Sequence, residues 1–283
     1  MTSSASDQAR AAIGQRFRSL RAACGMTGRE LAALTGWHPT KISKIERGRM
    51  TPSAEDVRIW LDKCGASDQE EEFQAAVAGV SEMYIPWHHL EYAGLRTSQT
   101  KVMPEWESAN LFRAYSHSIV PGPLQTGEYT RAVLSSIRDR RGLVDDVELA
   151  VEARLRKHEL LADPARKFEV VLEECVLRRL VSTAEVTVKQ LTRLIDLSYL
   201  PHVDIRIIPH HAEAAPRSRG WPVEDFWIFD SAHVAVELVS AYMTFTADVD
   251  VRNYEKTFSD LFGQGVGGAE ARQILFKALG GAT

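Results

Sequence analysis

Apolar residues at the start of the chain recur three and four positions apart, which is the spacing of an amphipathic helix. Ile13, Phe17 and Leu20 share one face of such a helix, and Gly25 suits the left-handed conformation that commonly ends one. Residues 1–9 show no such pattern and are expected to form a flexible tail. The first domain is therefore predicted to begin at residue 10.

Two capping boxes predict where the next helices begin. In a capping box, the first and fourth residues each accept a hydrogen bond from the other's backbone amide at the start of a helix. Thr27 and Glu30 form one box ahead of "LAAL", and Ser53 and Asp56 form another directly after Pro52. These signals predict short helices that start near residues 28 and 54.

The stretch between the two boxes has the composition of two short helices that cross closely. Such a crossing needs a small residue inside the first helix, a glycine in the turn and apolar residues on the inner face of the second. Ala32, Gly36, Ile42 and Ile45 meet these needs in that order. Pro39 would begin the second helix, because proline lacks an amide hydrogen and its fixed φ suits the first helical position.

The distribution of charge separates this part from the rest of the chain. Residues 1–66 contain 11 Lys+Arg and 6 Asp+Glu, a net charge of +5, whereas the remaining residues contain 23 and 32, a net charge of −9. The two sum to the net charge of −4 over 283 residues, a length that favours two domains. A small basic part and a larger acidic part indicate that only the first meets a polyanion.

The basic part resembles a known family of DNA-binding domains. Residues 10–64, and in particular "LRAACGMTGRELAALTGWHPTKISKIERGRMTPS", are similar to the DNA-binding domain of helix-turn-helix regulators of the xenobiotic-response-element (XRE) type. The resemblance implies that the second helix of the motif enters the major groove with its first residues near the base edges. The alternative is a plain helical bundle, which needs neither the glycine turn nor the basic cluster behind it.

Four residues at the start of that helix are the candidates for reading bases. Thr40 and Lys44 lie four apart and share one face, they match family positions that commonly meet bases, and a lysine there can donate to guanine O6 and N7. Lys41 points more to the side, with a phosphate as its alternative partner. Pro39 offers only an apolar edge, such as would touch a thymine methyl group.

Contact with DNA phosphates is expected of four further residues. Arg47 and Arg49 follow the helix in "ERGRM", a region that lies along the DNA backbone in the resembled family. Arg29 lies at the start of the preceding helix, whose free amides can also face a phosphate. His38 could cap the helix, contact a phosphate, meet a base or do none of these. Solvated surface charge is the alternative for Arg47 and Arg49.

Arg21 and Glu46 are expected to serve the structure rather than recognition. They match a pair that bridges the first and third helices in the XRE-type regulators that this part resembles. Their opposite charges, 25 positions apart in the sequence, would then join two elements of the domain.

The pattern beyond residue 66 predicts a helix and linker over 67–104 and a mixed α/β domain over 105–283. Helices are expected at 105–117, 126–138, 144–162, 184–199, 248–262 and 268–279. Strands are expected at 167–174, 202–209, 225–230 and 233–240. The first two strands flank a helix, as in a crossover unit, and the last two would form a hairpin with its turn at Asp230 to His233. The fold class is therefore α+β, an all-α domain followed by a larger mixed one.

The larger domain carries a second resemblance. "VPGPLQTGEYTRAVL", "VEARLRKHELL", "KFEVVLEECVLRRLV" and "VTVKQLTRLIDLSYLPHVDIRIIP" are similar, in this order, to the C-terminal domain that follows the same module in many actinobacterial regulators. These include relatives of the sporulation regulator WhiJ, and some are described as antitoxin-like because a small partner protein is encoded nearby. The resemblance covers nearly all of residues 105–280 and implies a cytoplasmic transcription regulator.

This second resemblance also suggests partners for the chain. The expected partners are double-stranded DNA, a second copy of the chain in a homodimer, and a small partner protein or a small-molecule effector. The candidate residues for the partner or effector site are Pro121, Gly122, Gln125, Thr126 and Glu173. Pro123 departs from the leucine that relatives usually have, which leaves the partner specificity open.

The chain is expected not to be an enzyme and to need no cofactor or metal. Adjacent residues on a strand point to opposite faces, so Glu173 and Glu174 are unsuited to one acid–base site. The histidine pairs 88–89 and 210–211 lack the spacing of a metal motif. Cys24, Cys64 and Cys175 lie far apart in the sequence and are expected to be reduced, buried thiols. The alternative is an enzyme domain tethered to DNA.

Overall fold

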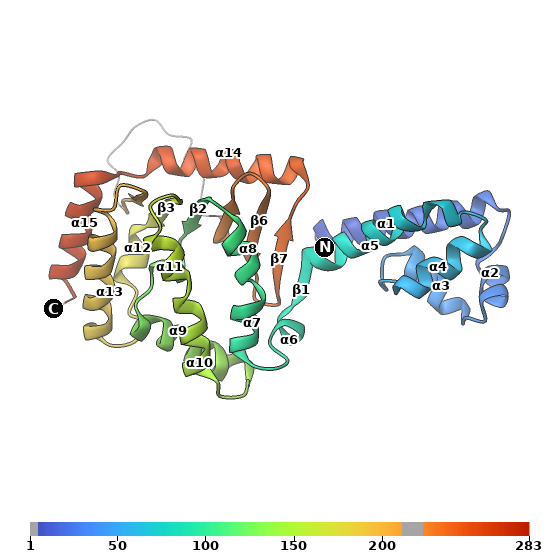
Figure 1. The fold of residues 1–283 in the computed structure, drawn as a ribbon, viewed down its shortest axis with the longest axis horizontal. Helices are drawn as coiled ribbons and strands as arrows, with labels where there is room; N and C mark the ends of the chain where they lie inside the picture. Colours follow the sequence, from blue (N-terminus) through green and yellow to red (C-terminus); the bar gives the residue numbers. More distant parts are fainter. Residues whose placement is uncertain (1–4, 211–222, 283) are drawn as a thin grey trace. The chain divides into compact units, whose positions relative to one another are not determined.

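The computed structural model describes residues 5–210 and 223–282, with side chains from residue 10 onward apart from residues 78 and 80–83. The chain divides into two compact units, Met1–Ile85 and Pro86–Thr283. An N-terminal helical unit followed by a mixed unit of helices and sheet is the α+β architecture that the sequence predicted (Figure 1).

The first unit is helical in its described part up to Met83, and its last two residues begin the strand β1 (Tyr84–Pro86). The helices are α1 (Ala5–Ala23), α2 (Gly28–Thr35), α3 (Pro39–Glu46), α4 (Ala54–Lys63), the 3₁₀ turn η1 (Ser67–Gln69) and α5 (Glu70–Met83). The predicted tail is too long, because α1 already begins at Ala5. Residues 1–4 lie outside the described part of the chain.

The core of this unit extends beyond the predicted boundary at residue 66. Phe17 of α1 meets Trp60 of α4 and Phe73 of α5 edge to face, with ring centroids 5.1 and 5.0 Å apart. Phe73 and Val77 are buried in the same cluster as Leu31 and Ile42. Aromatic pairs of this geometry stabilise a core beyond the area they bury. Helix α5, which the sequence predicted as a helix beyond the domain boundary, is therefore part of the helical unit.

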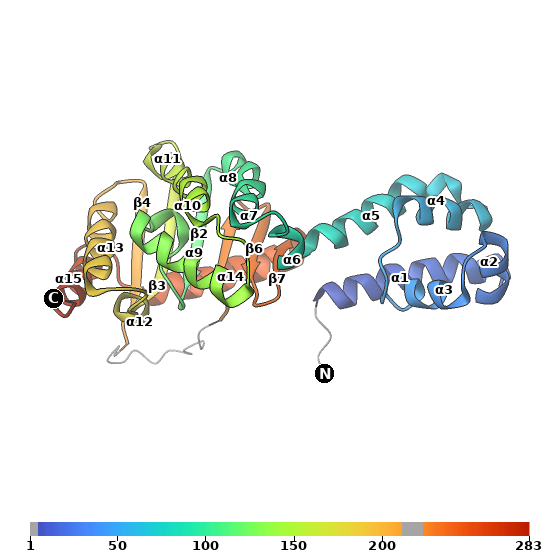
Figure 2. The same ribbon diagram turned by 90° about the horizontal axis from the view of Figure 1, so that it is seen from below.

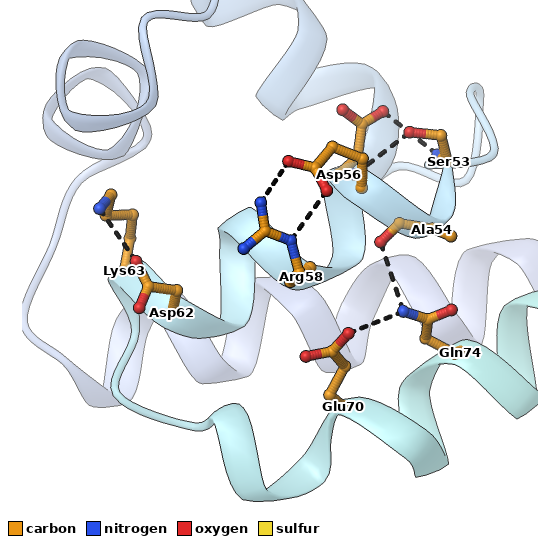
Figure 3. A network of polar contacts seen from close by, with 9 residues as sticks. Ser53, Ala54, Asp56, Arg58, Asp62, Lys63, Glu70 and Gln74 are labelled. Carbon is orange, nitrogen blue, oxygen red and sulfur yellow. Dashed lines mark hydrogen bonds and ion pairs between the residues drawn. The ribbon is translucent and has the colours of Figure 1, made fainter.

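Both predicted capping boxes are present. Thr27 and Glu30 exchange side-chain-to-amide hydrogen bonds at the start of α2, and Ser53 and Asp56 do so at the start of α4 (Figure 3). Gln74 of α5 donates to the carbonyl of Ala54 and to Glu70, which ties α5 to the beginning of α4. Caps of this kind contribute about 1 kcal/mol each to the stability of their helix.

The second unit surrounds a seven-stranded sheet with helices (Figures 1 and 2). The strands are β1 (Tyr84–Pro86), β2 (Leu111–Ser116), β3 (Lys167–Glu173), β4 (Val203–Ile208), β5 (Phe226–Phe229), β6 (His233–Glu237) and β7 (Ala241–Phe245), in the order β1-β7-β6-β5-β2-β3-β4. The helices are α6 (Trp87–Leu90), α7 (Leu95–Lys101), α8 (Met103–Ser108), α9 (Gly127–Arg141), α10 (Val147–Leu155), α11 (Lys157–Ala162), α12 (Glu174–Arg178), α13 (Ala184–Leu197), α14 (Asp248–Gln264) and α15 (Gly268–Gly280), and η2 (Gly122–Leu124) is a 3₁₀ turn.

The sheet contains the predicted crossover unit and hairpin. Strands β3 and β4 are parallel and connected through α13, with Val170 opposite Ile205. Strands β5 and β6 are antiparallel, and Asp230 in their turn has a φ of 52°. Strand β2 pairs in parallel with β3 and antiparallel with β5, so β2, β3 and β4 form a parallel group at one end of the sheet.

Two sequence predictions differ from the structure near the start of this unit. The sequence predicted a linker in the later part of 67–104, but residues 84–104 contain β1, α6, α7 and the start of α8. The helix predicted over 105–117 ends at Ser108 in α8, and Leu111–Ser116 is the strand β2. Leucine, alanine and arginine are good helix formers, but pairing with strands on both sides overrides that local preference. Strand β7 was not predicted.

Candidate nucleic-acid interface

The turn between α2 and α3 is held by backbone geometry. Gly36 ends α2 with a φ of 71°, and its amide and that of Trp37 both donate to the carbonyl of Ala32. Glycine accepts this left-handed conformation without strain from a β-carbon. Ile42 and Ile45 of α3 are 1% exposed and pack in the core, which fixes α3 by its inner face. The opposite face of α3 therefore remains free to meet a ligand.

Helix α3 begins at Pro39 and is capped by His38. The ring Nδ1 of His38 accepts a hydrogen bond from the amide of Thr40 at 3.2 Å. A neutral ring that accepts at Nδ1 carries its proton on Nε2, so Nε2 is the donor left for another partner. His38 thus acts as a cap, and its exposed ring can still donate to a phosphate.

The residues on the outer face of α3 are exposed in the predicted pattern. Pro39, Thr40 and Lys44 are all exposed at the start and end of the helix. Thr40 and Lys44 lie one turn apart, so both side chains project from the same side. The free face of α3 therefore carries both a hydroxyl and an ammonium group.

Lys41 differs from its prediction as a base-reading residue. Its Nζ lies 2.6 Å from Oδ1 of Asp56 in α4 and 4.1 Å from the ring centroid of Trp37. The ammonium is therefore bound on two sides within the helical unit. An ion pair and a cation–π contact would have to be given up before Lys41 could reach a base, so we assign Lys41 a structural role.

All but one of the Lys and Arg side chains of this unit fall into two groups; the exception, Arg10, lies over the ring of Tyr84, 5.8 Å from its centroid. Arg16, Arg21, Lys41, Arg58 and Lys63 each pair with a carboxylate. Among the residues whose side chains the structure describes, five exposed cations make no ion pair: Arg18, Arg29, Lys44, Arg47 and Arg49. Four of these five belong to α2, α3 and the segment directly after α3. Unpaired exposed cations are the groups that can neutralise phosphates without first losing a partner.

Arg21 and Glu46 form the predicted bridge between α1 and α3. The guanidinium donates to both carboxylate oxygens of Glu46, at 2.5 and 3.1 Å, and to the carbonyl of Met26 at 2.6 Å. The hydrogen bond with Glu46 raises the pKa of Arg21, although partial burial opposes this effect. Both side chains are 13% exposed, so this bidentate pair is better shielded from solvent than a surface ion pair.

Two glycines that the sequence reading did not single out bring α1 close to the end of α3. A β-carbon at Gly14 would lie 2.5 Å from the carbonyl oxygen of Ile45, and one at Gly48 would lie 2.6 Å from the amide nitrogen of Ala11. Gly48 also has a φ of 65°. Only glycine permits this close approach, which positions α3 and the arginines that follow it.

The predicted partner site around residues 121–126 is a packed part of the second unit. Gln125 is fully buried, donates to the carbonyl of Val120 and accepts from Thr130. The amide of Thr126 donates to the buried Gln190 at 2.7 Å, and the Thr126 side chain caps α9. Gln125 is therefore closed to a partner, and the prediction is wrong for this residue, whereas the half-buried Thr126 stays a prediction.

The remaining members of that predicted site are also placed by packing. Pro121 is buried. Gly122 is the first residue of the 3₁₀ turn η2, which also contains the buried Pro123. Glu173 ends β3 and accepts a hydrogen bond from the hydroxyl of Tyr115 at 3.0 Å. Glu173 therefore lies at the carboxyl end of β3. Partial burial raises its pKa, although the hydrogen bond from Tyr115 and the nearby histidines oppose the rise.

The cysteines differ in part from their prediction as buried thiols. Cys64 is buried, but Cys24 and Cys175 are exposed. Cys24 lies beside Cys64 and donates to its carbonyl at 2.9 Å, although the two are 40 positions apart. Burial, with the neighbouring Cys24, raises the pKa of Cys64 to about 12.

The histidine and acid candidates do not assemble into a metal site. Within residues 5–210 and 223–282, no three His, Cys, Asp or Glu residues are grouped so that they could hold a metal ion. His88 and His89 pack edge to face with ring centroids 4.3 Å apart, and His211 lies outside the described residues. In the same described part, no helix is long and apolar enough to cross a membrane.

Two family models match separate parts of the chain. A model of a helix-turn-helix domain matches residues 12–73, and a model of a domain of unknown function, DUF5753, matches residues 102–277. A comparison with curated proteins found no match. Among solved structures, the archaeal chromatin protein TrmBL2, whose structure is described as showing a novel mode of DNA binding, is similar with 13% identity and a TM-score of 0.32. That alignment covers 86% of this chain and 88% of the other.

The helix-turn-helix match includes α2, α3 and the segment after α3, which carry four of the unpaired exposed cations, and it supports DNA binding by this unit. The DUF5753 match spans 176 residues, from 102 to 277, which is more than half of the 283 residues. The chain belongs to the family of proteins that carry the DUF5753 domain, here behind a helix-turn-helix domain.

Proposed function

We propose that the protein is a sequence-specific transcription regulator that inserts α3 into the major groove of DNA. The observation that carries this proposal is the set of unpaired, exposed cations on α2, α3 and the following segment, in a unit that matches a helix-turn-helix domain. Helices of this motif read bases with the first turns of the second helix. Thr40 and Lys44 are the base-reading residues, with Pro39 as an apolar neighbour.

Phosphate contacts in this proposal come from residues on both sides of α3. Arg47 and Arg49 follow the helix, Arg29 lies in the first turn of α2, and His38 offers its Nε2. Such contacts set the position of the protein on the duplex but carry no sequence information directly. Lys41 is left out of both sets, because Asp56 and Trp37 hold its ammonium.

The regulator would act as a homodimer. One eight-residue helix reaches few base pairs, and useful specificity then requires two half-sites about one helical turn, ~34 Å, or a multiple apart. The second unit, Pro86–Thr283, is assigned to dimerisation and to receiving a signal. That signal is a small partner protein or a small-molecule effector, and the second unit itself is proposed to have no catalytic role.

The test is a selection of DNA fragments from a random pool by the purified full chain. A palindrome with half-sites spaced by a whole number of helical turns is the expected result, since it reports base reading and twofold symmetry together. Enrichment of a single, non-repeated site would contradict the homodimer alone. Fragments without any common sequence would contradict base reading by α3.

A further inference from the structure

A pocket of about 410 Å³ lies at the carboxyl ends of β3 and β4. Its lining residues come from α12, from the segment after α12 and from the residue that follows β4 by two positions: Glu174, Cys175, Arg178, Arg179 and His210. Because β2, β3 and β4 are parallel, their carboxyl ends meet at one edge of the sheet. Ligand sites of open α/β sheets lie outside the carboxyl ends of strands, although most often where the strand order reverses, which it does not do between β3 and β4. The volume falls within the range of small-molecule sites.

The carboxylates at this edge are already bound within the protein. Glu174 accepts from Arg178 at 2.6 Å and from the amide of His210 at 2.9 Å, and these contacts keep its pKa low against the opposing effect of burial. Glu173 accepts from Tyr115. These oxygens therefore have partners and do not call for a bound cation.

Asp225, at the start of β5, is occupied in the same way. It accepts hydrogen bonds from the hydroxyls of Ser116 and Ser118 and from the amide of His117, and it lies 2.6 Å from Nδ1 of the same histidine. This cluster closes the neighbouring ends of β2 and β5. The negative charge next to the pocket is thus held by donors of the protein itself.

Arg179 is the charged lining group without such a partner. Its side chain is exposed, and it makes no ion pair with any carboxylate in the part of the chain that the structure describes. Arg178 lies beside it and keeps 51% of its side chain exposed while it pairs with Glu174. A guanidinium presents several donors in one plane, which matches the oxygens of a carboxylate or phosphate.

The raised pKa of the Cys175 thiol favours a binding role for this pocket over covalent chemistry. Burial and the nearby Glu173 raise the pKa of its thiol. The thiolate is the nucleophilic form of cysteine, so a raised pKa leaves little of it at neutral pH. The exposed thiol is nonetheless a useful reporter of what occupies the pocket.

We propose that this pocket binds a small organic anion, whose carboxylate or phosphate group is held by Arg179 with Arg178 and His210 beside it. The inference deepens the proposed function, because it gives the signal-receiving unit an anionic small molecule as its effector. It rests on that function only for this regulatory meaning. Binding of the anion itself requires no DNA and is tested without it.

The experiment measures the alkylation rate of each cysteine in the full chain with iodoacetamide, a neutral reagent, followed by mass spectrometry of peptides. Inorganic phosphate is added in one arm, citrate in a second, and sodium chloride at matched ionic strength in a third. Cys175 is expected to react more slowly in the phosphate arm, the citrate arm or both, whereas Cys24, the exposed thiol of the helical unit, keeps its rate. The protecting arm identifies a phosphate or a carboxylate as the recognised group.

Variants connect the protection to Arg179. Arg179→Gln is expected to raise the anion concentration for half-maximal protection about tenfold, because a charge-assisted hydrogen bond is lost. Arg179→Lys keeps the charge and is expected to lie in between. Arg140→Gln is the matched control, since Arg140 is an exposed arginine on α9 that makes no ion pair among the described residues.

Three results would overturn the proposal: no slowing by either anion, equal slowing by sodium chloride, or full protection retained in Arg179→Gln. Rapid alkylation of the buried Cys64 would show that a variant is unfolded. If Arg179→Gln were unfolded, the anion concentration for half-maximal protection in Arg179→Lys would test the proposal instead. A failure of DNA selection would leave these rates unchanged, so the two proposals fail separately.

Discussion

Lys41 of α3 and Asp56 of α4 form an ion pair with 2.6 Å between Nζ and Oδ1, and the same aspartate caps α4 through Ser53. One carboxylate therefore fixes both the lysine beside the reading face and the helix that follows. Burial alone would raise the pKa of Asp56, but the hydrogen bonds from Lys41 and Ser53 bring it below its ordinary value.

This relationship predicts an acid-sensitive contribution to stability. The folded pKa of Asp56 is below the unfolded value, so the stabilisation is complete above about pH 3.9 and is lost as the pH falls through the folded pKa. Asp56→Asn should lower the free energy of unfolding by about 1–2 kcal/mol at pH 7 through loss of the ion pair and part of the cap. Chemical denaturation as a function of pH should show this difference shrinking below about pH 4. A difference that stays constant down to pH 2 would contradict the assignment.

Lys44→Ala tests base reading. It is expected to cost about 1–3 kcal/mol at the selected site and to relax the preference for the base that Lys44 meets. Titrations of the selected and a scrambled duplex at one salt concentration measure both effects. Lys63→Ala is the control, because Lys63 pairs with Asp62 on α4. An equal loss on both duplexes would make Lys44 a phosphate contact instead.

Arg49→Ala tests the phosphate contacts. Binding should weaken by a similar factor on every sequence, and the slope of log affinity against log salt should decrease by about 1. The matched control is Arg58→Ala, since Arg58 is an arginine of the same unit that pairs with Glu55. If the salt dependence of Arg49→Ala were that of the unchanged protein, Arg49 would not contact a phosphate.

Gly48→Ala tests the close approach of α1 to the end of α3. Gly25 and Gly48 have nearly the same φ, 72° and 65°, but a β-carbon would meet open space at Gly25 and the backbone of Ala11 at Gly48. Gly25→Ala should therefore cost about 1 kcal/mol from backbone strain alone. Gly48→Ala should cost about 1–3 kcal/mol more, the range for forcing extra atoms into a packed site. Similar unfolding midpoints for the two variants would show that α1 can move away without cost.

A fragment of residues 1–85 tests dimerisation by the second unit. It contains the whole helical core, including Phe73 and Val77, which a fragment ending at residue 66 would lack. The fragment should bind a selected palindrome much more weakly than the full chain at the same salt concentration, but a single half-site with similar affinity. Equal affinity on the palindrome would remove dimerisation from the second unit.

The helical unit could be predicted well because its signals are local. The capping boxes at Thr27 and Ser53 and the glycine turn at Gly36 each depend on a few neighbouring residues. Lys41 and Asp56 are 15 positions apart in the sequence, and Gly48 and Ala11 are 37 apart. No local sequence pattern predicts either contact.

The same distinction explains the outcome in the second unit. Strand β3 and the hairpin of β5 and β6 stood out as β-branched and aromatic runs. Strand β2 did not, because its residues are mixed in preference: leucine, arginine and alanine favour a helix, phenylalanine and tyrosine a strand, and the pairing with β3 and β5 decides. The pocket at Arg179 depends on which strands are neighbours in the sheet, and the strand order follows from long-range pairing that no local sequence pattern specifies.

The strand order also bears on how the chain folds. Strand β2 pairs with β3, which begins 56 residues after β2 begins, and with β5, which begins 115 residues after it. Closing such long loops lowers the folding rate, whereas short helices joined by brief turns form many of their contacts locally. We therefore expect the helical unit to fold faster than the sheet. During synthesis, strands β5 to β7 leave the ribosome long after α3, so the unit proposed to read DNA would be native while the signal-receiving unit is still incomplete.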